Sequence, residues 1–305
     1  EGQLASVALM DARSIAATAV NGGLLTAATE LGEKPISKVA YRFNQEVYEN
    51  RVYKGYGKAL PETELKFGPN ITDWPEMIPL PENLLLKMVS VITDPVTTTD
   101  ELIPSGDTSS YRSNPLKLAE FTLSRKDPGY VQRAKDIGKL EKERRSLKEV
   151  GQMSAALLEV FGALAKITGE EPEKLAEQTG LGSTIFAVKP GDGSAREQAA
   201  SCQKVLGGWS NIAAEYATKR YRSNLINWGM LPFTIDPADQ GKMVLNAFIY
   251  IPGIREAVKS GADRITAYLL KSGEKQEICL NLTDLSPGER DIILAGSLIN
   301  YYAGK

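Results

Sequence analysis

Gly191-Asp192-Gly193-Ser194-Ala195-Arg196-Glu197 is the stretch of sequence that decides the fold of the second half of this chain. The apolar run before it, Thr184–Val188, predicts a strand, and the segment Ser194–Leu206 predicts a helix. Gly191 and Gly193 allow the tight turn that joins the two. Short strands and helices continue to alternate after this unit, so the sequence predicts an α/β domain with a mixed sheet.

The remaining elements of this domain follow the same alternation. The predicted strands are Asn211–Ala214, Met230–Ile235, Arg264–Leu270 and Glu277–Asn281, and the predicted helices are Ala217–Trp228 and Ser286–Tyr302. Lys271-Ser272-Gly273-Glu274 is typical of a hairpin turn between the last two strands.

The amino-terminal part of the chain has a different organisation. Residues 6–10 predict a short buried strand, and Ala12–Val20 a helix that Asp11 caps and Gly22-Gly23 ends. This strand–helix unit has no sheet to join and the chain begins without Met. We therefore expect residues 1–27 to be the tail of a preceding domain in a longer protein. Residues 28–84, which are rich in proline towards their end, predict a linker that wraps over a surface.

The main domain is then expected over residues 85–305, with an insertion at about 126–180. Charged and apolar runs in this insertion predict three helices, over Arg133–Glu149, Met153–Ile167 and Glu171–Glu177, with Gly180 as a stop. Because its charges are of mixed sign, we interpret the insertion as a helical hairpin with a solvated surface.

Composition limits the possible chemistry. The chain has 305 residues, 42% of them hydrophobic, and a formal net charge of −2, so we expect neither nucleic acid nor a membrane as partner. Two cysteines and the lack of a signal peptide indicate a reducing, cytoplasmic location. The absence of histidine excludes a Ser-His-Asp triad and most zinc sites.

The stretch at 191–200 has two compatible interpretations. The free N–H groups and dipole at a helix start favour an anion, and Arg196 in the first turn is suited to grip a carboxylate at two points. Ser194 with Glu197 three residues later also fits a capping box, which supplies only helix stability and which the spacing by itself favours.

Four segments, in order, resemble the carboxyl-terminal swivel domain of the aconitase superfamily. They are Thr98-Thr99-Asp100-Glu101-Leu102-Ile103-Pro104-Ser105-Gly106, Gly193-Ser194-Ala195-Arg196-Glu197-Gln198-Ala199-Ala200, Asn224-Leu225-Ile226-Asn227-Trp228-Gly229-Met230-Leu231-Pro232-Phe233 and Ala295-Gly296-Ser297-Leu298-Ile299-Asn300. The family's own forms of these segments are T-T-D-H-I-S-x-A-G, G-S-S-R-E-H-A-A, N-L-x-x-x-G-x-L-P-L and A-G-S-A-L-N. The resemblance implies a layered β/β/α swivel fold that carries the 126–180 insertion.

The resemblance also implies roles for particular residues. Ser194 matches the serine that, as an alkoxide, removes the proton next to a substrate carboxylate. Arg196 matches an arginine that binds substrate carboxylate, and Arg112, twelve residues after Asp100, matches a second one. Asp100, with Thr99 beside it, matches a position near the family's iron–sulfur cluster.

Several positions depart from the family pattern. Ala195 replaces a serine that contacts substrate, and Glu101, Ile103 and Gln198 replace His, Ser and His. The substrate is therefore not expected to bind as citrate does. These departures also motivate an alternative, a family member kept as a catalytically silent binding or regulatory module.

The family's [4Fe-4S] cluster is held by three cysteines on the preceding domains, and Cys202 and Cys279 are interpreted as core residues. We therefore expect no metal in this chain, no activity from it alone, and those cluster-bearing domains and a small hydroxy di- or tricarboxylate as its partners. RNA binding, known among iron-responsive relatives, is disfavoured by the absence of a basic stripe.

Overall fold

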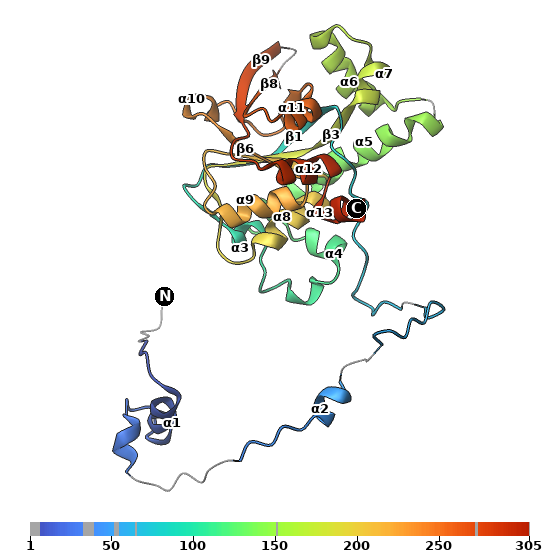
Figure 1. Ribbon diagram of the computed structural model, residues 1–305. Helices are drawn as coiled ribbons and strands as arrows, with labels where there is room; N and C mark the ends of the chain where they lie inside the picture. The colour runs from blue at the N-terminus through green and yellow to red at the C-terminus, as the bar shows by residue number, and fades with distance from the viewer. Residues whose placement is uncertain are drawn as a thin grey trace. The chain divides into compact units, whose positions relative to one another are not determined.

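The computed structural model describes residues 7–32, 40–51, 55–64, 66–150, 152–271 and 274–304. The chain divides into two compact units, Glu1–Leu65 and Lys66–Lys305, which are described separately (Figure 1). The first unit contains the helices α1 (Ala12–Val20), η1 (Ala28–Leu31, a 3-10 helix) and α2 (Glu46–Glu49).

Helix α1 begins and ends as its sequence predicts. The Asp11 carboxylate accepts hydrogen bonds from the backbone N–H groups of Arg13 and Ser14, at 2.9 and 3.1 Å. The predicted strand over residues 6–10 is wrong for the described residues 7–10, which form no strand and expose Val7 and Leu9. A strand requires a partner strand, and the described part of this unit contains none.

Seven strands of the second unit close into a barrel, in the order β1-β3-β5-β6-β9-β8-β7. They are β1 (Asn83–Ile92), β3 (Thr179–Ala187), β5 (Gly208–Ala213), β6 (Leu231–Ile235), β7 (Phe248–Ile251), β8 (Arg264–Lys271) and β9 (Glu274–Asn281). The neighbours from β1 to β6 pair in parallel, and the other neighbours pair antiparallel. The predicted α/β fold with a mixed sheet is confirmed. Ser272 and Gly273, the centre of the predicted hairpin turn, lie outside the described residues.

The helices of this unit pack around the barrel (Figure 1). They are α3 (Thr99–Leu102), η2 (Ser109–Tyr111), α4 (Pro115–Ala119), α5 (Tyr130–Val150), α6 (Ala155–Thr168), α7 (Pro172–Gln178), α8 (Arg196–Val205), α9 (Lys219–Asn227), α10 (Pro237–Gln240), α11 (Ile254–Ser260), α12 (Pro287–Ala295) and α13 (Leu298–Ala303). Two further strands, β2 (Thr97–Thr98) and β4 (Pro190–Asp192), pair with each other outside the barrel.

Strand β1 is buried on both faces, because helices cover the side that the barrel leaves free. Leu84, Leu86 and Met88 pack in one apolar cluster with residues of β5 to β9. Leu85 packs instead with α5, α6 and α7, and Val89 with α8 and α9. Such two-sided burial accounts for the nearly continuous apolar sequence of this strand.

The insertion at 126–180 is more than a solvated surface hairpin. Ile137 of α5 and Phe161 of α6 are fully buried and pack against Leu85 and Leu181 of the barrel. The paired carboxylate of Glu141 in α5 also accepts the backbone N–H of Leu181 at 2.8 Å. The predicted hairpin surface is therefore corrected: one face of these helices is part of the core. Gly180, the predicted stop, lies inside β3.

The predicted closing helix Ser286–Tyr302 is two helices. Ser286 caps α12 in a capping box with Glu289, and Gly296, with φ of 89°, ends it. Ser297 then caps α13 through its hydroxyl. The residues 66–82 that precede β1 form neither helix nor strand, as their prolines predict, and Trp74 contacts Trp228 with a ring-centroid distance of 4.4 Å.

Candidate functional site

The Thr97–Asp100 segment and the Gly191–Arg196 segment, about 90 residues apart in sequence, meet in the structure. Strands β2 and β4 pair in parallel, with Thr97 opposite Pro190 and Thr98 opposite Asp192. Gly193 has φ of 127°, and a Cβ atom there would overlap the Thr99 hydroxyl. Only glycine combines this backbone conformation with such a close approach.

Helix α8 begins two residues later than predicted. Its N-cap is Ala195, which offers no side-chain hydrogen bond, and its first residue is Arg196. The predicted Ser194–Glu197 capping box is wrong, because Glu197 accepts instead from Trp228 Nε1 at 3.1 Å. In the described part of the chain no group hydrogen-bonds Ser194 Oγ, and Ser194 is exposed.

A cavity of about 400 Å³ opens at this helix start. It is lined by Ser194, Arg196, Glu197, Lys219, Arg220, Ser223 and Asn224. The lining contains three cationic side chains and one carboxylate, and the first N–H groups of α8 have no partner within the helix. Such an arrangement favours the binding of a small anion, such as a carboxylate, beside the Ser194 hydroxyl.

Helix α9 supplies the part of this cavity that sequence patterns did not indicate. Basic residues on a helix commonly form a solvated face, but Lys219 and Arg220 line the cavity. Arg222 instead donates hydrogen bonds to the backbone carbonyls of Thr283 and Asp284. The N-cap hydroxyl of Thr218 was the local signal for where α9 begins, but nothing local indicated the neighbour it faces.

The buried side chain of Tyr221 holds α9 against α8. The Tyr221 hydroxyl accepts from Gln203 Nε2 at 2.9 Å and from Asn211 Nδ2 at 2.7 Å, and burial raises the pKa of this phenol. Its ring lies against Gly191, where φ of 96° and the lack of a side chain leave room for it. The two helix starts that form the cavity are thereby fixed relative to each other.

The other predicted site residues lie around this turn at different depths. Ala195 is the N-cap, and buried Thr99 contacts Gly193. Asp100 follows Thr99 in α3, but its carboxylate is paired with Arg125 at 3.0 Å. Arg112 is exposed at the end of η2 and does not line the cavity described above. Its substrate-binding role stays a prediction, as do those of the other predicted residues.

One stretch of the chain matches a known protein family. Residues 177–238 match the family described as "Aconitase C-terminal domain", a range that includes both the Gly193–Ala200 and the Asn224–Phe233 segments. This stretch of the chain is similar to an aconitase-type carboxyl-terminal domain. The resemblance noted in the sequence is confirmed.

Two named relatives and one solved structure are similar to this chain. The chain is 36% identical over 116 residues to a protein named "Putative aconitate hydratase, mitochondrial" from Aspergillus fumigatus, and 35% identical to one of the same name from Emericella nidulans. These matches cover 37% and 36% of this chain but only 14% of each relative. A crystal structure of 3-isopropylmalate dehydratase from Methanocaldococcus jannaschii matches with a TM-score of 0.41 and 20% identity, over 72% of this chain and 94% of that one.

Glu101, which stands where the aconitase family has His, is part of the local structure of α3. Its carboxylate accepts the backbone N–H of Thr98 at 2.7 Å and Lys126 Nζ at 3.1 Å. Burial by itself raises the pKa of this carboxyl, but these hydrogen bonds outweigh burial and hold the pKa below its ordinary value. The ionised form of Glu101 therefore supports the turn that positions Thr99.

Replacing Glu101 with glutamine is expected to flatten the loss of stability in acid. A carboxyl with a lowered folded pKa contributes stability above its unfolded pKa and loses it as pH falls through the folded pKa. Glu101→Gln keeps an acceptor for the Thr98 N–H but lacks the charge, so at neutral pH we expect a loss of about 1 kcal/mol or less. Urea unfolding from about pH 3 to 7 measures both effects. Parallel curves for the two proteins would show that Glu101 does not contribute in this way.

The cysteines of the chain do not suit the iron–sulfur cluster that the family implies. Cys202 is buried in α8, and burial raises the pKa of its thiol to about 12, whereas a cluster ligand is a thiolate. Cys279 lies on β9, a different element. The described residues also contain no group of three Cys, His, Asp or Glu side chains placed to hold a metal ion.

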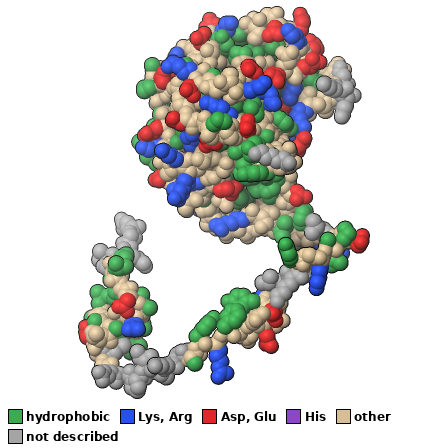
Figure 2. Space-filling model, in the orientation of Figure 1, with side chains coloured by type: hydrophobic (Ala, Val, Ile, Leu, Met, Phe, Trp, Pro, Cys, Tyr) green, Lys and Arg blue, Asp and Glu red, His purple; other side chains and the backbone are tan. Residues whose placement is uncertain are grey.

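Surface properties add two observations. On the face shown in Figure 2, acidic and basic side chains are interspersed. Within the described residues, no helix combines the length and the apolar character needed to cross a membrane.

Proposed function

We propose that this chain is the carboxyl-terminal swivel domain of an aconitase-like hydro-lyase, which dehydrates and rehydrates a hydroxy di- or tricarboxylate. The single observation that carries the proposal is the cavity at the start of α8, where an unpartnered Ser194 hydroxyl stands among Arg196, Lys219 and Arg220. The match of residues 177–238 to the aconitase carboxyl-terminal family and the similarity to proteins named aconitate hydratase support it. In this proposal other domains of a longer chain complete the active site and hold the [4Fe-4S] cluster.

In this proposal Ser194 Oγ is the general base. Removing a proton next to a carboxylate requires the alkoxide, and an unassisted serine hydroxyl is far too weak an acid to form it near neutral pH. A cation about 5 Å from the oxyanion stabilises it by about 3 kcal/mol at an effective dielectric constant near 20, or about 2 pKa units. Arg196, Lys219 and the N–H groups of α8 together supply several such contributions.

The same groups orient the substrate. Arg196 binds one carboxylate through its guanidinium fork, and the N–H groups of α8 bind anionic oxygens beside it. Arg112 binds a further carboxylate from the neighbouring segment, and Asp100 and Thr99 face the cluster-bearing domains. Ala195 lacks the hydroxyl that the family's serine at this position offers to substrate. The cationic side chains, rather than a pair of serines, therefore determine which class of substrate binds.

A conservative change at Arg196 tests the carboxylate contact. In the complete protein, purified without oxygen, we expect Arg196→Lys to raise KM for the hydroxycarboxylate substrate about 100-fold, because lysine cannot form the two-point contact. The assay follows the conjugated acid by ultraviolet absorbance over a panel of citrate, isocitrate, malate and isopropylmalate. Lys259→Arg, on the exposed side of α11, is the control. Unchanged KM in Arg196→Lys contradicts the assignment.

The alternative is a catalytically silent binding module, and one observation favours it. Glu101 is engaged by Thr98 and Lys126 where the family has a histidine. In that case the complete protein dehydrates nothing in the panel and shows no iron–sulfur absorbance. The two relatives are named mitochondrial, a different compartment from the cytoplasm expected for this chain. The cytoplasmic location therefore stays a prediction.

A further inference from the structure

Lys204, at the opposite end of α8 from Arg196, is a buried lysine whose charge has only an aromatic ring as a contact partner among the described residues. Lys204 is 6% exposed, and within the described residues its Nζ has no hydrogen-bond partner. The ammonium lies over the Trp209 ring, 3.8 Å from the ring centroid. An ammonium group carries three donors, and leaving all of them unpaired away from water costs several kcal/mol, so burial favours the neutral amine until a ligand supplies acceptors.

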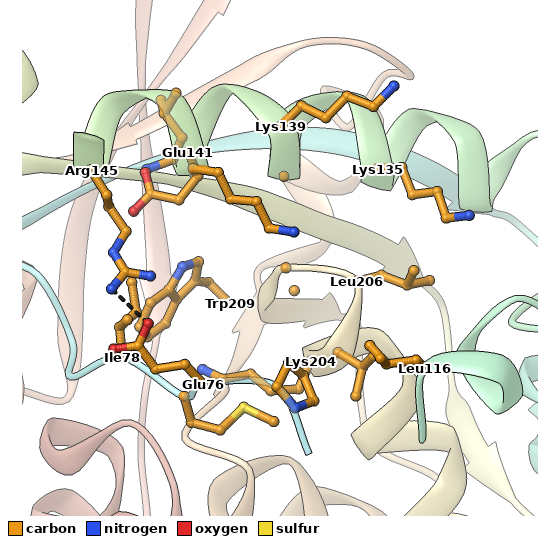
Figure 3. Close-up of a pocket in the computed structure, with 18 of the residues that line it drawn as sticks. Glu76, Ile78, Leu116, Lys135, Lys139, Glu141, Arg145, Lys204, Leu206 and Trp209 are labelled. Atoms are coloured by element: carbon orange, nitrogen blue, oxygen red, sulfur yellow. Dashed lines mark hydrogen bonds and ion pairs between the residues drawn. The ribbon is translucent and has the colours of Figure 1, made fainter. Parts of the chain in front are cut away.

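The side chain lines a cavity of about 390 Å³, a size suited to a small organic ligand. Figure 3 shows Lys204 and Trp209 on one wall, and Lys135 and Lys139 of α5 on the facing side. Apolar surface between them comes from Ile78, Leu116, Leu206 and Trp209, all of which line the cavity.

The acidic side chains of this cavity are already occupied, so they do not compensate Lys204. Glu76 pairs with Arg145 at 2.8 Å, and Glu120 with Lys135 at 2.6 Å. Glu141 pairs with Arg144 at 2.6 Å and accepts the Leu181 N–H at 2.8 Å. The cavity therefore keeps an excess of positive charge.

We propose that this cavity is a second ligand site, which binds a small organic carboxylate with an apolar body. The carboxylate accepts hydrogen bonds from the Lys204 ammonium, and the apolar body lies against Trp209, Leu116 and Leu206. A metal cation is excluded by the surplus of cationic side chains. An inorganic anion leaves the apolar walls uncovered, so it fits the cavity less well.

This site is separate from the cavity at Ser194. The two cavities share no lining residue. Arg196 and Lys204 are eight positions apart on one helix, or about 12 Å along its axis at the usual rise per residue. The inference therefore does not depend on the proposed hydro-lyase activity, and a binding measurement on the 305-residue chain tests it alone.

Benzoate is the probe, because it joins a carboxylate to a flat apolar ring. We expect one benzoate per chain by isothermal titration calorimetry, accompanied by a change in Trp fluorescence. Lys204→Met keeps the length and apolar stem of the side chain without the charge, and should weaken benzoate binding at least tenfold. Benzyl alcohol, which lacks the charge, should bind weakly and equally to both proteins. Equal benzoate affinity in the wild type and Lys204→Met overturns the proposal, as does no binding to the wild type.

A pH series on the wild type keeps the test decisive if Lys204→Met fails to fold. Burial lowers the pKa of Lys204 to about 7. Because the carboxylate needs the charged form, affinity should fall as pH rises above 7, by up to tenfold per unit. Seven other charged side chains line the same cavity: Lys135, Lys139, Lys142, Arg145, Glu76, Glu120 and Glu141. Where Lys204→Met folds, subtracting its pH profile removes their contribution. Affinity that is constant from pH 7 to 9 in the wild type contradicts a role for Lys204.

Discussion

Ser194→Ala, made in the complete protein, is expected to lower kcat about 1000-fold with little change in KM. A positioned general base contributes about 100- to 10,000-fold to a proton abstraction, and alanine at this position has no group to take the proton. KM is preserved because Arg196 and the N–H groups of α8 still hold the carboxylate. The fall in kcat with constant KM is the signature of a group that acts only in the transition state.

Steady-state kinetics over the hydroxycarboxylate panel measure this effect. Ser260→Ala is the matched control, since Ser260 is an exposed serine at the end of α11, far along the chain from the cavity residues. Circular dichroism and thermal unfolding establish that both variants fold. If Ser194→Ala keeps more than a tenth of the wild-type kcat while Arg196→Lys loses activity, the cavity binds substrate but Ser194 is not the base.

Gly229→Ala is expected to destabilise the chain by about 3 kcal/mol or more. Gly229 has φ of 64°, and a Cβ atom there would overlap the backbone carbonyl of Gly296. Gly296, with φ of 89°, in turn lies so close to the Ile78 carbonyl that it also has no room for a side chain. Backbone cannot move aside as a flexible side chain can, so alanine forces apart the turn after α9, the turn after α12 and the segment before β1.

A second glycine separates the two causes of this loss. Gly253 has φ of 60° but open space where a Cβ would stand. Gly253→Ala therefore carries only the backbone strain, about 1 kcal/mol. Urea unfolding of the 305-residue chain measures both variants. Equal losses in the two variants would mean that the contact between Gly229 and Gly296 contributes nothing beyond backbone conformation.

These glycines explain why two of the four family segments look like scaffold rather than chemistry. Asn224–Phe233 and Ala295–Asn300 each provide one glycine of a three-way backbone contact, and neither segment needs a reactive side chain for this role. Asn300 also donates hydrogen bonds to the carbonyls of Met77 and Ala295, at 2.5 and 2.9 Å. The sequence indicated the motifs, but their common function is visible only in the folded chain.

Local sequence signals predicted most element types, because the forces that set them act within a few residues. Asp11 caps α1, and Gly22-Gly23 ends it, through contacts spanning three or four residues. Apolar runs predicted five of the seven barrel strands, namely β3, β5, β6, β8 and β9. The same local reasoning failed where a distant residue competes: Glu197 had the spacing of a capping box, but Trp228 takes its carboxylate.

The sequence by itself indicated the α/β class, the resemblance to the aconitase family and the residues Ser194, Arg196, Thr99 and Asp100 as candidates, because motif and periodicity are properties of neighbouring positions. Only the tertiary structure decided that the Thr99 and Ser194 segments meet at Gly193, and that Lys219 and Arg220 join them. It also decided that Lys204, an ordinary helix lysine in the sequence, is buried beside Trp209 with no hydrogen-bond partner in the described part of the chain. The reason is physical: desolvation and charge pairing depend on which surfaces the closed barrel brings together, and no local pattern records those distances.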